Sequence, residues 1–142
     1  MNSSPPVVAW QKRFPQQIKQ GRPDVAAARQ KLALAQTHLA RAKGLLQAKQ
    51  YDLALMTAEL ALVVSADAIV VRDGFICSDH ASRLAYPSLP PLFSANAALA
   101  RQIRTSRNAA QYDAAGGTSQ AFATQATALA EQAVNAVMLL IP

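Results

Sequence analysis

Residues 53–71 form the most apolar segment of the chain, and they carry only two charged side chains, Glu59 and Asp67. The segment is long enough to cross a membrane, but an acidic side chain at the bilayer centre costs about 2.5–3.5 kcal/mol on insertion scales. A helix that is apolar nearly all round is instead buried on several sides by protein. The segment therefore predicts the central helix of a bundle, and we expect no membrane partner.

The sequence before and within this segment favours a helical hairpin. The chain is rich in alanine, the strongest helix former, and contains only five glycines. Few aromatic residues and few long β-branched runs argue against a sheet. A second helix that begins at Asp52 and ends near Gly74 follows almost without a loop, which predicts an antiparallel pair. The first helix is expected at about residues 24–50, with Asp24 as its N-cap and one apolar face formed by Leu32, Ala35, Leu39, Ala42 and Leu46.

Two more long helices follow an irregular region. Residues 78–86 are expected to form a short helix capped by Ser78, and the third long helix covers about residues 91–110. The fourth begins at Thr118 or Ser119, and Glu131 is its only charge, so it must pack on several sides or meet a partner chain. These segments predict an all-α fold: an up-down bundle of four main helices with a short extra helix between the second and the third.

Residues 1–23 are expected to form a basic N-terminal arm. They contain four prolines and four basic residues but no acid. Proline removes backbone donors and breaks helices, so the arm holds at most a short helix. Trp10 and Phe14 indicate that it docks on the rest of the protein. We expect one helical domain, residues 24–142, with this arm before it.

Charge and cysteine content set wide bounds on function. Fourteen basic and eight acidic residues give a net charge of +6, which suits a nucleic-acid or nucleotide partner and equally a mildly basic surface. Cys77 is the only cysteine, which excludes an intrachain disulfide and a thiolate metal cluster. This composition suits a reducing cytoplasm. His80 lies three residues after Cys77, but a buried structural cysteine is commoner than a reactive pair.

The stretch RQIRTSRNAAQYD, residues 101–113, gathers the basic residues of the third helix. At about 100° per residue, Arg101, Arg104, Arg107 and Asn108 fall within one arc, opposite the apolar stripe. Four arginines and no carboxylate lie between residues 79 and 113. One interpretation of the arc is a solvated face, with cations near a helix C-terminus. The other is a phosphate-binding surface, because one guanidinium group can donate two parallel hydrogen bonds to a phosphate.

Three stretches together resemble the HEPN superfamily of small all-α domains. The first runs from Ala35, AQTHLARAKGLLQAKQYDLALMTAELALVVSADAIVVRDG, and is similar to the family's opening hairpin. The second, SDHASRLAYPSL, is similar to its histidine-bearing loop and short helix. The third, RQIRTSRNAAQYD with the following AAGGTS break, resembles its arginine motif. The resemblance covers about residues 30–140.

This resemblance implies an RNA-related function in a symmetric dimer that brings two arginine motifs into one cleft. Active members are metal-independent ribonucleases of toxin–antitoxin, defence and RNA-processing systems. By position, Arg107 is the motif arginine, Asn108 its polar companion, and Tyr112 stands where many members have histidine. Arg101 and Arg104 would bind phosphate. We expect no metal and no cofactor.

Tyr112 leaves two functions open. Tyrosine, with an ordinary pKa near 10, is a poor general base unless that pKa is lowered. One alternative is a metal-independent endoribonuclease that uses Arg107, Asn108 and Tyr112. The other is a non-catalytic HEPN-like module that binds RNA or nucleotide phosphate or partners a nucleotidyltransferase.

Glu59 and Asp67 lie eight residues apart, or about 80° around the helix. A buried carboxylate needs a partner, and the arginine helix is the obvious source. One of the two acids is therefore expected to hold a motif arginine in position, and the resemblance favours Asp67. Paired carboxylates for metal binding fit less well, because neither a histidine nor a third acid accompanies them.

Overall fold

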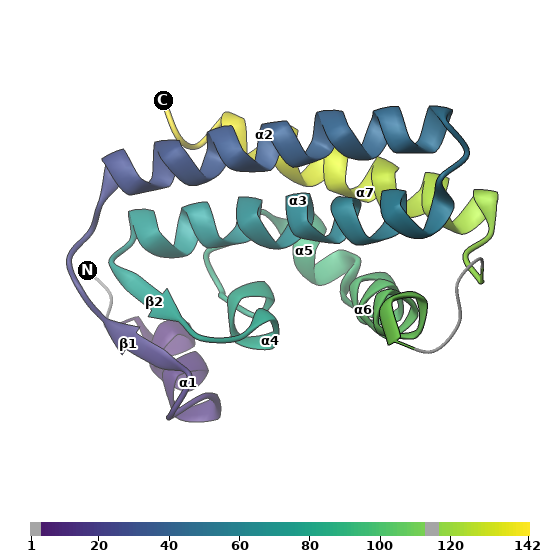
Figure 1. Ribbon diagram of the computed structural model, residues 1–142. Coiled ribbons are helices and arrows are strands. Elements are labelled where there is room, and N and C mark those ends of the chain that lie inside the picture. The colour runs from purple at the N-terminus through teal and green to yellow at the C-terminus, as the bar shows by residue number, and fades with distance from the viewer. Residues whose placement is uncertain (1–3, 113–116) are drawn as a thin grey trace.

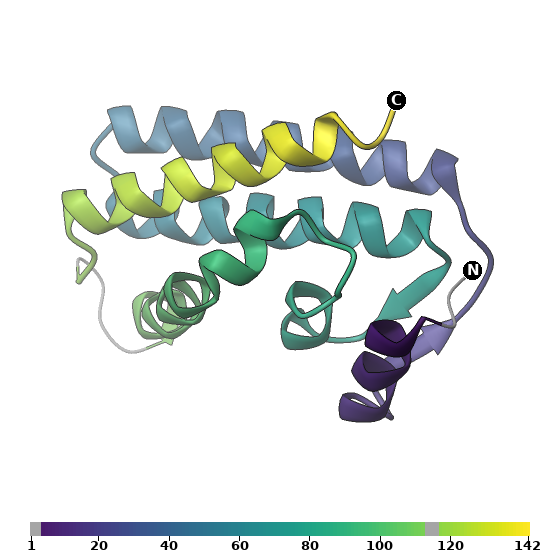
Figure 2. The same ribbon diagram turned by 180° about the vertical axis from the view of Figure 1, so that it is seen from behind.

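Three long helices lie side by side and form the body of the molecule: α2 (Val25–Gln47), α3 (Tyr51–Arg72) and α7 (Gln120–Met138) (Figures 1 and 2). The computed structural model describes residues 4–112 and 117–142, without the side chains of residues 110–112. Within these residues there are seven helices and one two-stranded sheet, which confirms the all-α class.

The expected caps of α2 and α7 are confirmed. The Asp24 carboxylate accepts a hydrogen bond from the Ala27 backbone N–H at 2.9 Å, and the Ser119 hydroxyl accepts one from that of Phe122 at 3.1 Å. Each cap satisfies a donor that the first helical turn leaves free. The predicted face of α2 is buried at Leu32, Ala35, Leu39 and Ala42, whereas Leu46 at its end is only partly buried; Ala28 extends the buried face toward the N-terminus.

The turn between α2 and α3 contains a left-handed residue that was not predicted from the sequence. Lys49 has a φ of 60°, the left-handed region that glycine prefers. The Lys49 N–H donates to the Leu46 carbonyl at 3.1 Å, and the Gln50 N–H donates to that of Leu45 at 2.9 Å. These two bonds form a Schellman motif, which closes α2 and reverses the chain within a few residues.

The sequence QYD had predicted Asp52 as the N-cap of α3, and this prediction is wrong. Gln50 occupies the cap position, and the Asp52 carboxylate accepts a hydrogen bond from the Thr118 N–H at 3.1 Å. Asp52 therefore ties the chain before α7 to the start of α3. The predicted stop at the other end is confirmed: Gly74 has a φ of 92°, and a Cβ there would lie 2.8 Å from the Pro23 nitrogen.

Most of α3 is buried. By length and composition this helix could cross a membrane, and 72% of its apolar window lies inside the molecule. Glu59 and Asp67 are buried with it, at 2% and 8% exposure. Because buried carboxylates need partners, we expect cationic side chains from neighbouring elements to contact both residues.

The predicted third long helix is two helices. Asn96 separates α5 (Pro91–Ala95) from α6 (Ala97–Tyr112), with a φ of −111° and a ψ of 23°. Its side-chain amide donates to the Leu92 carbonyl at 2.8 Å, and its own carbonyl accepts from the Ala100 N–H at 2.9 Å. This change of direction lets α6 run across α3, so that Figure 1 shows α6 nearly end-on.

The N-terminal residues build the lower part of the molecule in Figure 1. Helix α1 (Pro5–Arg13) places Val7 and Trp10 in the core. Strand β1 (Ile18–Gln20) pairs antiparallel with β2 (Phe75–Cys77), with Ile18 opposite Cys77. The composition had argued against any sheet. A three-residue pairing between distant segments gives no periodic pattern from which it could be predicted.

The short helix between the second and third long helices is present as α4 (His80–Leu84). Its cap is Asp79 and not Ser78: the Asp79 carboxylate accepts from the Ser82 N–H at 2.9 Å. The helix begins one residue later than it would with a serine cap, and His80 becomes its first residue.

Candidate anion-binding site

The arginine face of α6 divides into two layers. Arg101 and Asn108 are exposed, whereas Arg104 and Arg107 are half-buried and turn toward α3. On the opposite side of α6, Ile103 is buried at 1% exposure. The helix is therefore amphipathic as predicted, but the basic arc is only in part a solvated face.

Glu59 of α3 is the acid that meets these arginines. Its side chain is 3% exposed, and its Oε1 lies 3.4 Å from Arg104 Nη1 and 3.5 Å from Arg107 Nε. Burial raises the pKa of the Glu59 carboxyl above its ordinary value, and the two guanidinium groups oppose that shift. One carboxylate oxygen thus serves two cations.

This sharing leaves Arg107 incompletely bonded. Its Nε is buried and has no hydrogen-bond partner among the described residues, and its 3.5 Å contact with Glu59 is an ion pair only. Its Nη1 donates to Asn108 Oδ1 at 3.3 Å. The adjacent motif residues Arg107 and Asn108 therefore contact each other, and Asn108 remains exposed.

His80 joins the site, which sequence reasoning missed. Its Nδ1 contacts Arg104 Nη1, although 24 residues separate the two in the chain. Burial, followed by the charge of Arg104, lowers the pKa of His80 to about 4, so the imidazole is neutral at pH 7. The sequence SDH did place His80 in the predicted short helix. Nothing in the sequence, however, showed that this helix, α4, faces α6.

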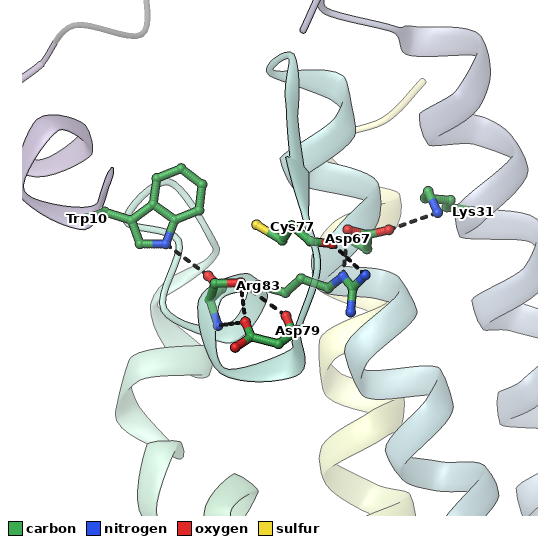
Figure 3. Close-up of polar contacts among 7 residues, drawn as sticks. Trp10, Lys31, Asp67, Cys77, Asp79 and Arg83 are labelled. Carbon is green, nitrogen blue, oxygen red and sulfur yellow. Dashed lines mark hydrogen bonds and ion pairs between the residues drawn. The ribbon is translucent and has the colours of Figure 1, made fainter. Parts of the chain in front are cut away.

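Asp67 has other partners, contrary to the expectation that it would hold a motif arginine. Its carboxylate pairs with Lys31 Nζ at 2.8 Å and with Arg83 Nε at 3.0 Å, and Arg83 Nη2 also donates to the Cys77 carbonyl at 2.7 Å (Figure 3). Asp67 thus links α2, α3, β2 and α4. The acid at the arginine helix is Glu59.

The same network fixes the position of α4, and therefore of His80. Trp10 Nε1 donates to the Ser82 carbonyl at 2.8 Å, and Asp79 binds both the backbone N–H and the hydroxyl of Ser82 (Figure 3). Cys77 is buried beside this helix, and burial raises the pKa of its thiol. A protonated, buried thiol is a structural group and not a nucleophile.

A cavity of about 580 Å³ adjoins the site. It lies between α4, α5 and α6, with α3 and α7 behind it. Its lining includes the polar side chains of Arg13, His80, Arg101 and Arg104, together with apolar side chains such as Phe93 and Leu129. A volume of this size is typical of small-molecule sites.

Two expected features lie beyond these contacts. Tyr112 is the last residue of α6, and its side chain lies outside the described part of the chain. In the described ranges, no three His, Cys, Asp or Glu side chains gather as they would around a metal ion.

Comparison of the chain with protein-family models, with curated proteins and with solved structures finds no match in any of the three. The resemblance to the HEPN superfamily therefore stays a prediction.

Proposed function

We propose that this protein is a HEPN-like domain that binds RNA or nucleotide phosphate through the arginine face of α6. One observation carries the proposal: Arg101, Arg104 and Arg107 lie on one face of α6, and a single buried carboxylate, Glu59, lies against Arg104 and Arg107. Three guanidinium groups against one carboxylate leave an excess of positive charge. Guanidinium groups in such an excess suit phosphate oxygens, which accept paired hydrogen bonds.

The arrangement also prepares the arginines for a ligand. The Glu59 side chain of α3 is buried, and it pairs with the guanidinium groups of Arg104 and Arg107 on the side of α6 that faces α3. Arg104 nevertheless keeps 42% of its side chain exposed, so a phosphate can reach it. Side chains that are already ordered lose less entropy on binding than free ones, which favours affinity.

The remaining elements of the proposal come from the HEPN resemblance. We infer that α2, α3, α6 and α7 correspond to the four main helices of the up-down bundle. The protein would act in the cytoplasm as a homodimer that joins two α6 faces in one cleft. The alternative is a non-catalytic module whose partner is a nucleotidyltransferase.

A metal-independent ribonuclease of a toxin–antitoxin or defence system is the second candidate. The observation in its favour is the neutral imidazole of His80 against Arg104, since RNA cleavage through the 2′-hydroxyl needs a group that accepts a proton. A pKa of about 4 makes His80 a weak base, so the geometry supports binding more strongly than cleavage. Tyr112 remains the candidate given by the motif.

Fluorescence anisotropy with a short labelled single-stranded RNA tests the binding proposal. We expect Arg104→Ala to weaken binding and to reduce the slope of log affinity against log salt by about 0.7, the value for one lost phosphate contact on single-stranded RNA. Arg41→Ala removes the same charge from an exposed position on α2 and is the matched control. Equal affinities for both variants, or no binding by the wild type, would contradict the proposal.

Incubation of the same RNA in EDTA tests the enzyme candidate. Wild type, Arg107→Ala, His80→Ala and Tyr112→Phe are compared at equal concentration. Cleavage that is lost in Arg107→Ala supports a ribonuclease, and the other two variants identify the proton acceptor. Binding without any cleavage at high protein concentration leaves the non-catalytic module.

A further inference from the structure

The cavity beside α6 combines apolar walls with cationic side chains. Leu62 of α3, Phe93 of α5 and Leu129 of α7 supply large apolar walls, while Arg101 and Arg104 of α6 lie along the lining. Among the described residues, no carboxylate lines the cavity. Its charge is therefore positive: Arg101 and Arg104 lie on α6, and Arg13, the last residue of α1, also lines the cavity.

This combination selects a ligand by its two ends. The apolar walls favour a hydrocarbon or aromatic body, since removal of apolar surface from water contributes about 25 cal/mol per Å². The guanidinium groups favour an anionic head, which they bind through charge-assisted hydrogen bonds. His80 is neutral at pH 7 and adds a polar contact without charge. A cationic ligand would meet like charges in the lining.

We propose that this cavity binds a small amphipathic organic anion, a carboxylate or a phosphate monoester with an apolar body. The head would lie at Arg101 and Arg104, and the body against Phe93 and Leu129. This ligand would also compete with RNA, because Arg104 belongs to both sites. The competition rests on the proposed function, whereas binding of the anion does not.

Isothermal titration calorimetry with four probes tests the proposal. Decanoate and decyl phosphate carry the two alternative heads, decanol carries none, and decyltrimethylammonium reverses the charge. We expect saturable binding of at least one anion to the full chain, and weaker or no binding of decanol and decyltrimethylammonium. The stronger of the two anions identifies the head group.

Two variants locate the bound probe. Ala97 lines the cavity, and Ala97→Leu should narrow it and reduce anion affinity by at least about tenfold through steric conflict. Ala98→Leu, at the neighbouring exposed position of α6, should leave affinity unchanged. Arg101→Ala should weaken binding about fivefold to tenfold, because a charge-assisted bond is lost at an exposed side chain.

The outcomes separate this inference from the RNA proposal. Anion binding that Ala97→Leu abolishes supports the inference, whether or not RNA binds. Absence of binding for both anions, equal binding of decanol, or equal affinity of the two leucine variants would overturn it. Light scattering on the same samples completes the test: a change in oligomeric state caused by Ala97→Leu alone would assign the cavity to a contact between copies of the chain.

Discussion

Replacement of Trp10 tests whether the N-terminal helix is part of the folded unit. Trp10 is 4% exposed and packs against Phe75 and Tyr86, with ring centroids 5.1 and 4.7 Å away. Its indole N–H donates to the buried Ser82 carbonyl at 2.8 Å. Substitution of this single side chain therefore removes aromatic packing, a hydrogen bond and the link between α1 and α4.

Two substitutions separate these contributions. Trp10→Phe keeps an aromatic ring but leaves the Ser82 carbonyl without its donor, which costs about 1–3 kcal/mol. Trp10→Ala also opens a cavity, and deletion of a buried tryptophan side chain costs about 3–5 kcal/mol. Because a domain is stabilised by only about 5–15 kcal/mol in total, the alanine variant should lose a large part of its free energy of unfolding.

Urea unfolding followed by circular dichroism measures both variants, because Trp10 is the only tryptophan and its fluorescence is lost with it. Lys12→Ala, at an exposed position of the same helix, is the control and should change stability by less than about 0.5 kcal/mol. In the wild type, emission should shift to longer wavelength on unfolding. A loss below about 1 kcal/mol for Trp10→Ala would refute the docking of α1.

Three further predictions concern local backbone geometry and protonation. Lys49→Gly should stabilise the protein by about 0.5–1 kcal/mol by relief of the left-handed φ of 60°, while Lys49→Ala should not; urea midpoints compare them. Gly74→Ala should destabilise by more than about 1 kcal/mol, because its Cβ would lie 2.8 Å from the Pro23 nitrogen; the same assay shows this. The pKa of His80 is lowered in the folded state, so the contribution of His80 to stability should be lost as the pH falls from 6.5 to about 4. Urea unfolding of the wild type and of His80→Gln across this pH range, with an NMR titration of the imidazole, shows whether stability falls in this direction.

Local signals predicted α2, α3 and α7 well, but they missed the break at Asn96 that divides the third predicted helix. Three helix ends are fixed by a residue within a few positions of the end itself: Asp24 at the start of α2, Ser119 at the start of α7 and Gly74 after the end of α3. The residue type alone therefore identifies these boundaries. Features that depend on distant partners were missed. Asp52 could have capped α3, but the folded chain brings Thr118 to its carboxylate. The pairing of β1 with β2 likewise depends on where α1 docks.

The candidate site shows the same division. The arginine arc followed from helical periodicity, but the choice between Glu59 and Asp67 did not. Both acids lie on a helix that is buried nearly all round, so no polar face indicates which of them meets α6. The packing of α4 decides between the two acids. Arg83 of α4 pairs with Asp67 at 3.0 Å, and Glu59 pairs with Arg104 and Arg107 of α6.

The state of these arginines gives the strongest reason to expect an anionic partner. Arg104 and Arg107 turn toward apolar α3, and the buried Glu59 carboxylate needs a partner of opposite charge there. One carboxylate oxygen, 3.4 and 3.5 Å from the two cations, compensates their charge only in part. Arg107 Nε still has no hydrogen-bond partner among the described residues. A phosphate group brings several acceptor oxygens and would relieve the repulsion between Arg101, Arg104 and Arg107. The incomplete neutralisation of the arginines, more than their number, is therefore the argument for the proposed anionic ligand.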